Sequence, residues 1–186
     1  MEAFSDGVIA IIITIMVLEL KIPEGSDWAA LRPLLPVFLS YVMSFLFVGV
    51  YWNNHHHLLQ ASRHVTGSVL WANLHLLFWL SLVPASTAWM GETGFAPWPV
   101  AAYGTVLLFA GSAYFVLTRT LIHCHGTDST LAKAVGRDAK GLFSLVLYSV
   151  AIPSSFYRPG FALALYVLNT IVWLIPDRRI EKKMRE

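Results

Sequence analysis

Apolar residues gather into six runs along the chain, separated by short polar segments. The runs cover roughly residues 4–20, 30–52, 67–90, 100–123, 142–153 and 160–175. Each approaches the ~20 residues that an α-helix needs to cross ~30 Å of hydrocarbon. The pattern therefore predicts an all-α, polytopic membrane protein with six transmembrane helices.

Prolines add detail to this outline. Pro33 and Pro36 lie in the early turns of the second run, where a helix tolerates proline best. Pro84 lies inside the third run, where the missing N–H group and the ring predict a kink.

Composition supports the membrane assignment. Hydrophobic residues make up 56% of the chain and charged residues 13%, whereas a soluble domain averages about 25% charged residues. The net charge of +2 is too small to indicate a nucleic-acid partner, and the single cysteine, Cys124, excludes an internal disulfide framework. No linker divides the chain, so we expect residues 1–186 to form one membrane domain that ends in a basic tail, residues 177–186.

The basic residues predict the orientation of the helices. With six spans, both termini lie on one side of the membrane. Ten of the thirteen lysines and arginines fall on that side, and only Lys21, Arg32 and Arg158 fall on the other. The positive-inside rule then predicts cytoplasmic termini for a multi-pass protein of the cell membrane.

Ser5 and Asp6 stand one turn into the first span. The second span runs antiparallel and returns to the same membrane level at Trp52 and His55. Because an ionisable group at that depth is costly unless it is paired, we expect Asp6 to interact with the Trp52 indole and the His55 imidazole. Ser5 and Asp6 are also typical residues of a helix N-terminal cap, and both roles are compatible.

One face of the first span carries a regular stripe. Gly7, Ile11, Thr14 and Leu18, with the adjacent Ile15, recur at spacings of three and four residues, and Asp6 points away from them. Such a face is commonly a helix-packing surface. It could also form the wall of a pore with a hydrophobic constriction and a hydroxyl ring, which would require an oligomer.

Other polar residues carry less information. The runs His55-His56-His57 and His123-Cys124-His125 do not have the spacing of a metal site, so we expect no bound metal or other cofactor. Asn73 is a candidate for an interhelical hydrogen bond, and His75 could do the same or titrate. No catalytic motif is readable, so an enzyme is not expected. The Thr-Val-Gly-Tyr-Gly filter of ordinary potassium channels is absent as well.

These motifs together resemble one family. Phe4-Ser5-Asp6 at the start of the first span, its Ile/Thr-rich continuation and Trp52-x-x-His55 at the end of the second are similar to the transmembrane protein 175 family. Asn73 and Pro84 in the third span fit the same pattern. The family comprises endolysosomal potassium channels and their bacterial homologues, and six spans correspond to one family repeat. The family arginine four residues before the phenylalanine would fall before Met1.

The resemblance implies a cation channel that prefers potassium over sodium and has no pore loop. It implies a homotetramer in the lipid bilayer, with the first span of each subunit lining a central pore and K⁺ as the permeant ion. The family's constriction isoleucine falls on Ile11, its further apolar rings on Ile15 and Leu18, and its pore threonine on Thr14. Its polar network falls on the Phe4-Ser5-Asp6 motif together with Trp52 and His55.

Other functions remain open from the residues alone. A proton-coupled carrier could use Asp6, His55 and His75 as a relay, although no inverted repeat is visible. An intramembrane enzyme or an accessory membrane subunit are further alternatives.

Overall fold

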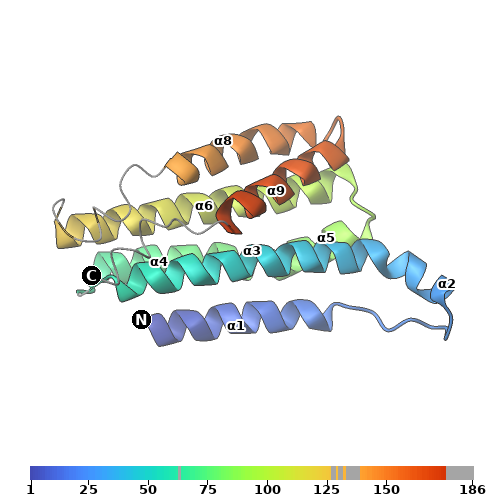
Figure 1. Ribbon diagram of the computed structural model, residues 1–186, viewed down its shortest axis with the longest axis horizontal. Helices are drawn as coiled ribbons and strands as arrows, with labels where there is room; N and C mark the ends of the chain where they lie inside the picture. Colours follow the sequence, from blue (N-terminus) through green and yellow to red (C-terminus); the bar gives the residue numbers. More distant parts are fainter. Residues whose placement is uncertain (63, 127–128, 130–131, 133–138, 175–186) are drawn as a thin grey trace.

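The computed structural model describes residues 1–62, 64–126, 129, 132 and 139–174, and these are helical apart from connecting segments. Figure 1 shows long helices lying side by side in an elongated bundle. In chain order they are α1 (Glu2–Leu18), α2 (Trp28–Leu31), the 3₁₀ turn η1 (Arg32–Leu34), α3 (Leu35–Gln60), α4 (Gly67–Ser81), α5 (Val83–Glu92), α6 (Pro97–His125), α8 (Ala139–Ser154) and α9 (Pro159–Leu174).

The predicted all-α fold with six apolar segments is confirmed. The second segment comprises α2, η1 and α3, and the third comprises α4 and α5. Three segments, Trp28–Gln60, Gly67–Glu92 and Pro97–His125, are long and apolar enough to cross a membrane. α8 and α9 are apolar but have 16 residues each, or about 24 Å of helix, and α1 has 17. The predicted basic tail, residues 177–186, lies outside the described residues.

Where a kink was predicted at Pro84, the structure has a break between two helices. α4 ends at Ser81 and α5 begins at Val83, with Pro84 in its first turn. A proline ring collides with the carbonyl group four residues earlier, here that of Leu80, and it offers no N–H to that carbonyl. The chain therefore restarts as a new helix at this point.

The core of the bundle forms around α6, which packs against α4, α5, α8 and α9. Gly104 permits the closest approach in this core, because a Cβ atom at this position would lie 2.7 Å from Cζ of Tyr166. The Tyr166 hydroxyl donates a hydrogen bond to the carbonyl oxygen of Val100 at 3.2 Å. α9 is thereby held against the first turns of α6.

α1 lies at the edge of the bundle in Figure 1 and packs on α3, α4 and α5. Its first turn lies at the same end of the bundle as the last turns of α3 and the first turn of α4. At the opposite end, Nζ of Lys21 pairs with a carboxylate oxygen of Glu92 at 2.8 Å, and this hydrogen bond raises the pKa of the Lys21 ammonium. The segment after α1 is thus tied to the end of α5.

Candidate functional site on the first helix

α1 has two different faces. Ser5, Ile9, Ile12 and Met16 are buried against the rest of the subunit. The opposite face is uncovered: Ile11 is 58% exposed and Leu18 is 80% exposed. The chain therefore uses one face of α1 for its own packing and leaves the other uncovered.

The uncovered face carries the stripe predicted to line a pore. All five residues of this stripe are exposed on the single chain: Gly7, Ile11, Thr14, Ile15 and Leu18. The Thr14 hydroxyl donates to the backbone carbonyls of Ala10 and Ile11, at 3.1 and 2.9 Å. Because its hydrogen is shared between these carbonyls, the Thr14 oxygen presents lone pairs on this face, and lone pairs attract cations.

Phe4 belongs to this uncovered face. It is 59% exposed and precedes Ile11 by seven residues, which is about two helical turns. The resemblance placed Phe4 in the polar network; in the structure the Phe4 side chain is exposed, whereas the neighbouring Ser5 is fully buried. Phe4 extends the uncovered face toward the N-terminal end of the helix.

Ser5 enters a buried hydrogen-bonded network that joins three helices. The Asn73 amide on α4 donates to the Ser5 hydroxyl oxygen at 2.9 Å. The Asn73 carbonyl oxygen lies 2.8 Å from Nε2 of His55 on α3. Asn73 is 2% exposed and His55 is fully buried. The expected interhelical role of Asn73 is therefore visible, and it connects α1, α3 and α4.

Asp6 enters a second, half-buried cluster. The Trp52 indole N–H donates to Oδ1 of Asp6 at 3.1 Å. The Oδ2 atom of Asp6 lies 3.6 Å from Nδ1 of His56, and an oxygen of Glu2 lies 3.2 Å from the same nitrogen. The sequence correctly indicated Trp52 as the partner of Asp6, but the histidine beside Asp6 is His56 and not His55.

Glu2 and His56 were not anticipated from the sequence, although helical spacing contained the signal. Glu2 and Asp6 are four residues apart on α1, and Trp52 and His56 are four residues apart on α3. Residues at this spacing share a helical face. If Trp52 reaches Asp6, His56 projects about 40° from Trp52 toward the same turn of α1. His55 projects about 100° from His56, on the side where it meets Asn73 of α4.

The residues of the predicted proton relay are not connected. His55 bonds to Asn73, while His75 accepts a hydrogen bond from the Trp79 indole at 3.0 Å. His75 lies on an exposed face of α4. Among the described residues, no hydrogen bond or ion pair joins Asp6, His55 and His75 to one another.

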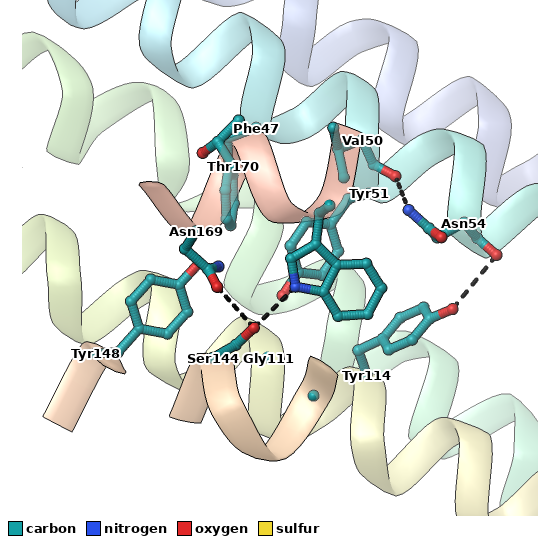
Figure 2. Close-up of a pocket in the computed structure, with 12 residues that line it drawn as sticks. Phe47, Val50, Tyr51, Asn54, Gly111, Tyr114, Ser144, Tyr148, Asn169 and Thr170 are labelled. Atoms are coloured by element: carbon teal, nitrogen blue, oxygen red, sulfur yellow. Dashed lines mark hydrogen bonds between the residues drawn. The ribbon is translucent and has the colours of Figure 1, made fainter. Parts of the chain in front are cut away.

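A separate pocket lies between α3, α6, α8 and α9 (Figure 2). The Ser144 hydroxyl accepts from the Trp173 indole at 2.8 Å and lies 2.8 Å from Oδ1 of Asn169. The Asn169 amide donates to the Tyr148 hydroxyl. These polar groups use one another as partners, as buried groups must, and they connect the last two helices to each other.

Comparisons with known proteins point in one direction. A family model described as "Endosomal/lysosomal potassium channel TMEM175" matches residues 1–84. A protein of Chryseobacterium named as a potassium channel is 55% identical over 186 residues, covering 100% of this chain and 97% of the relative. Another protein named as a potassium channel, from Chamaesiphon minutus, is 32% identical over 183 residues, with 93% and 85% covered.

Structural similarity agrees. The crystal structure of a lysosomal potassium-selective channel TMEM175 homolog from Chamaesiphon minutus matches with a TM-score of 0.76 and 28% identity, covering 94% of each chain. A rat protein named endosomal/lysosomal proton channel TMEM175 is 31% identical over 170 residues. The match covers 81% of this chain but only 34% of the rat protein.

Proposed function

This chain belongs to the TMEM175 family, and from that membership we propose that it is a potassium-permeable channel whose pore is lined by α1. We further propose that residues 1–186 act as one channel domain and that four copies surround the pore. K⁺ is the permeant ion, and no catalytic step is involved.

The uncovered face of α1 is the observation that carries this proposal. Ile11, Thr14 and Leu18 face away from the subunit core, while Ile9, Ile12 and Met16 on the other face pack inside it. One helical face cannot enclose a water column. Copies of α1 arranged about a symmetry axis can do so, and the family resemblance supports four copies.

The chemistry of this face suits selection by dehydration. A ring of Ile11 side chains offers no ligand to replace water, so an ion that passes it must shed part of its hydration shell. K⁺ is less strongly hydrated than Na⁺ and loses water at lower cost. The Thr14 oxygens, whose lone pairs face outward, can then replace part of the lost water three residues further along α1.

The two polar clusters support the pore by fixing α1. The Ser5–Asn73–His55 network holds α1 to α3 and α4, and the Asp6–Trp52 bond holds it to α3 at the adjacent residue. Two contacts in different directions set the rotation of α1 about its own axis. We therefore assign these residues to the alignment of the pore helix and not to ion transfer.

We place the protein in the cell membrane with both termini in the cytoplasm. The support is the distribution of lysines and arginines over the predicted loops, of which Lys21, Arg32 and Arg158 alone lie on the opposite side. Most of the basic residues on the cytoplasmic side, including Arg63 and those of the tail, lie outside the described residues.

Flux through purified protein in liposomes tests the function. With opposed K⁺ and Na⁺ gradients, we expect a reversal potential near the K⁺ equilibrium value. Ile11→Asn should raise K⁺ flux and reduce the preference for K⁺, because the asparagine amide groups around the pore can solvate both K⁺ and Na⁺. Val17→Asn is the matched control, since Val17 is exposed on α1 about 120° from Ile11. Wild-type selectivity in Ile11→Asn would exclude Ile11 as the constriction.

A proton-coupled carrier is the second candidate. The animal relatives are named as proton channels, so proton movement must be measured as well. The same liposomes loaded with a pH-sensitive dye decide between the two. A carrier gives flux that saturates with substrate and moves protons with it. A pore gives ohmic single-channel steps, with or without an accompanying proton leak.

A further inference from the structure

The cluster of Glu2, Asp6 and His56 lies outside the pore-facing stripe of α1 and has the geometry of a metal centre. One ligand atom from each residue can be chosen so that all three lie within 4.8 Å of one another. We propose that these residues form a binding site for a divalent cation of the Zn²⁺ class, which joins α1 to α3.

The distances match a tetrahedral ion. Zn–N and Zn–O bonds of about 2.0–2.1 Å place neighbouring ligand atoms about 3.3 Å apart in a tetrahedron. In the structure, Nδ1 of His56 lies 3.2 Å from the Glu2 oxygen and 3.6 Å from Oδ2 of Asp6. Two edges of the coordination polyhedron are thus in place before an ion is added, and the Glu2 side chain can adjust the third.

The His56 nitrogen is available for an ion. Nδ1 of His56 is shielded from solvent and makes no hydrogen bond of acceptable geometry, although the two carboxylates lie close to it. An Nδ1–H would have to point directly at one carboxylate oxygen to make a hydrogen bond, whereas an ion on the in-plane lone pair of an unprotonated Nδ1 can lie between the two carboxylates. The arrangement therefore suits coordination better than hydrogen bonding.

Outer contacts support the three ligands. The Trp52 indole binds Oδ1 of Asp6 and leaves Oδ2 directed at His56. The Gln60 amide lies 2.9 Å from Nε2 of His56. Rotation of this amide by 180° presents its oxygen to an Nε2–H donor, which leaves Nδ1 unprotonated for the ion. Hydrogen bonds of this kind, made by the ligand atoms that do not face the ion, are typical of histidine and carboxylate ligands in metal centres.

The charge of the cluster favours the same ligand. Glu2 and Asp6 lie on one face of α1, and within the described part of the chain their only ion-pair partner is His56. A divalent cation would balance two adjacent carboxylates. One imidazole and two carboxylates suit Zn²⁺ with water in the fourth position, whereas Mg²⁺ and Ca²⁺ prefer sites built from oxygen ligands alone.

Metal binding to the purified full-length protein in detergent tests the site. Zn²⁺ affinity is measured by calorimetry, and Co²⁺ replaces Zn²⁺ for its visible absorption, which reports tetrahedral coordination. We expect His56→Ala and Glu2→Gln to weaken Zn²⁺ binding at least tenfold and to remove the Co²⁺ band. The matched controls are His57→Ala, at the neighbouring histidine, and Glu19→Gln, at an exposed acid on the far side of the membrane.

Each outcome decides the question. Equal affinity in the wild type and in both site variants overturns the proposal, and so does binding that disappears only when His125 or Cys124 is replaced. If His56→Ala does not fold, Glu2→Gln carries the test, because Glu2 lies in the first turn of α1 and its side chain is 42% exposed.

A consequence for transport rests on the proposed function. If α1 lines the pore, an ion that ties α1 to α3 should hold that helix in place and reduce K⁺ flux, and Glu2→Gln should abolish the reduction. If no variant shows flux, the proposed channel function fails while the binding measurements still stand.

Discussion

Removing the Asn73 amide is the sharpest test of how α1 is held. Asn73→Ala deletes the donor to the Ser5 hydroxyl at 2.9 Å and the acceptor beside Nε2 of His55 at 2.8 Å. The Ser5 hydroxyl keeps its own bond to the Met1 carbonyl. His55 is left with no partner for either ring nitrogen among the described residues, because its Nδ1 already has none.

The magnitude follows from these contacts. A hydrogen bond contributes about 1 kcal/mol net in soluble proteins and about 0.6 kcal/mol between membrane helices. Two lost bonds therefore cost about 1–2 kcal/mol, and a buried imidazole without a partner adds about 1–3 kcal/mol. Since the unfolded protein in a membrane also finds partners for polar groups, we expect a loss of about 2–3 kcal/mol in the free energy of unfolding.

Reversible unfolding in mixed micelles of a mild detergent and SDS, followed by circular dichroism, measures this loss. Protein concentration is kept constant, because assembly of subunits changes apparent stability. Asn54→Ala is the matched control, since the Asn54 amide donates to the Val50 carbonyl of its own helix at 2.8 Å. If Asn73→Ala costs no more than Asn54→Ala, or less than about 0.5 kcal/mol, the network does not hold α1.

Three further changes test other parts of the structure. Thr14→Ala should lower the K⁺ preference, measured as reversal potential, and an unchanged channel would dismiss a role for the hydroxyl. Asp6→Asn should reduce the assembled fraction in size-exclusion chromatography with light scattering more than it changes selectivity; a well-expressed, normally assembled variant contradicts this. Gly104→Ala should destabilise by about 1–3 kcal/mol, because its Cβ meets the Tyr166 ring, whereas Gly111→Ala has room for the added methyl group and should leave the melting temperature unchanged.

Hydropathy and proline positions predicted most of the fold. Six apolar runs became helices because a backbone in hydrocarbon must satisfy its hydrogen bonds internally, and the helix does so within one segment. The boundaries were less predictable. α3 continues to Gln60, well past Trp52, because Asn54, His55 and His56 find partners on neighbouring helices or within their own. Those partners are not visible in a hydropathy pattern.

The site was predicted in part, for a geometric reason. Membrane level alone brought the first turn of α1 beside the end of α3, which was enough to pair Asp6 with Trp52. The depth of a residue in the membrane does not determine how a helix is rotated about its axis. To choose between His55 and His56, one must also know which face of α3 carries Trp52. His56 follows Trp52 by one turn, and the two rings stack with centroids 5.7 Å apart.

The same geometry explains why two adjacent polar residues precede the apolar stripe. Ser5 and Asp6 project about 100° apart, and each meets a different partner, Asn73 on α4 or Trp52 on α3. A single contact would let α1 turn about its axis, whereas two contacts in different directions do not. With that rotation fixed, Ile11 lies about 140° around the helix from Asp6 and faces away from the subunit. The direction of the proposed constriction is therefore set about one and a half turns away, by hydrogen bonds at the end of the helix.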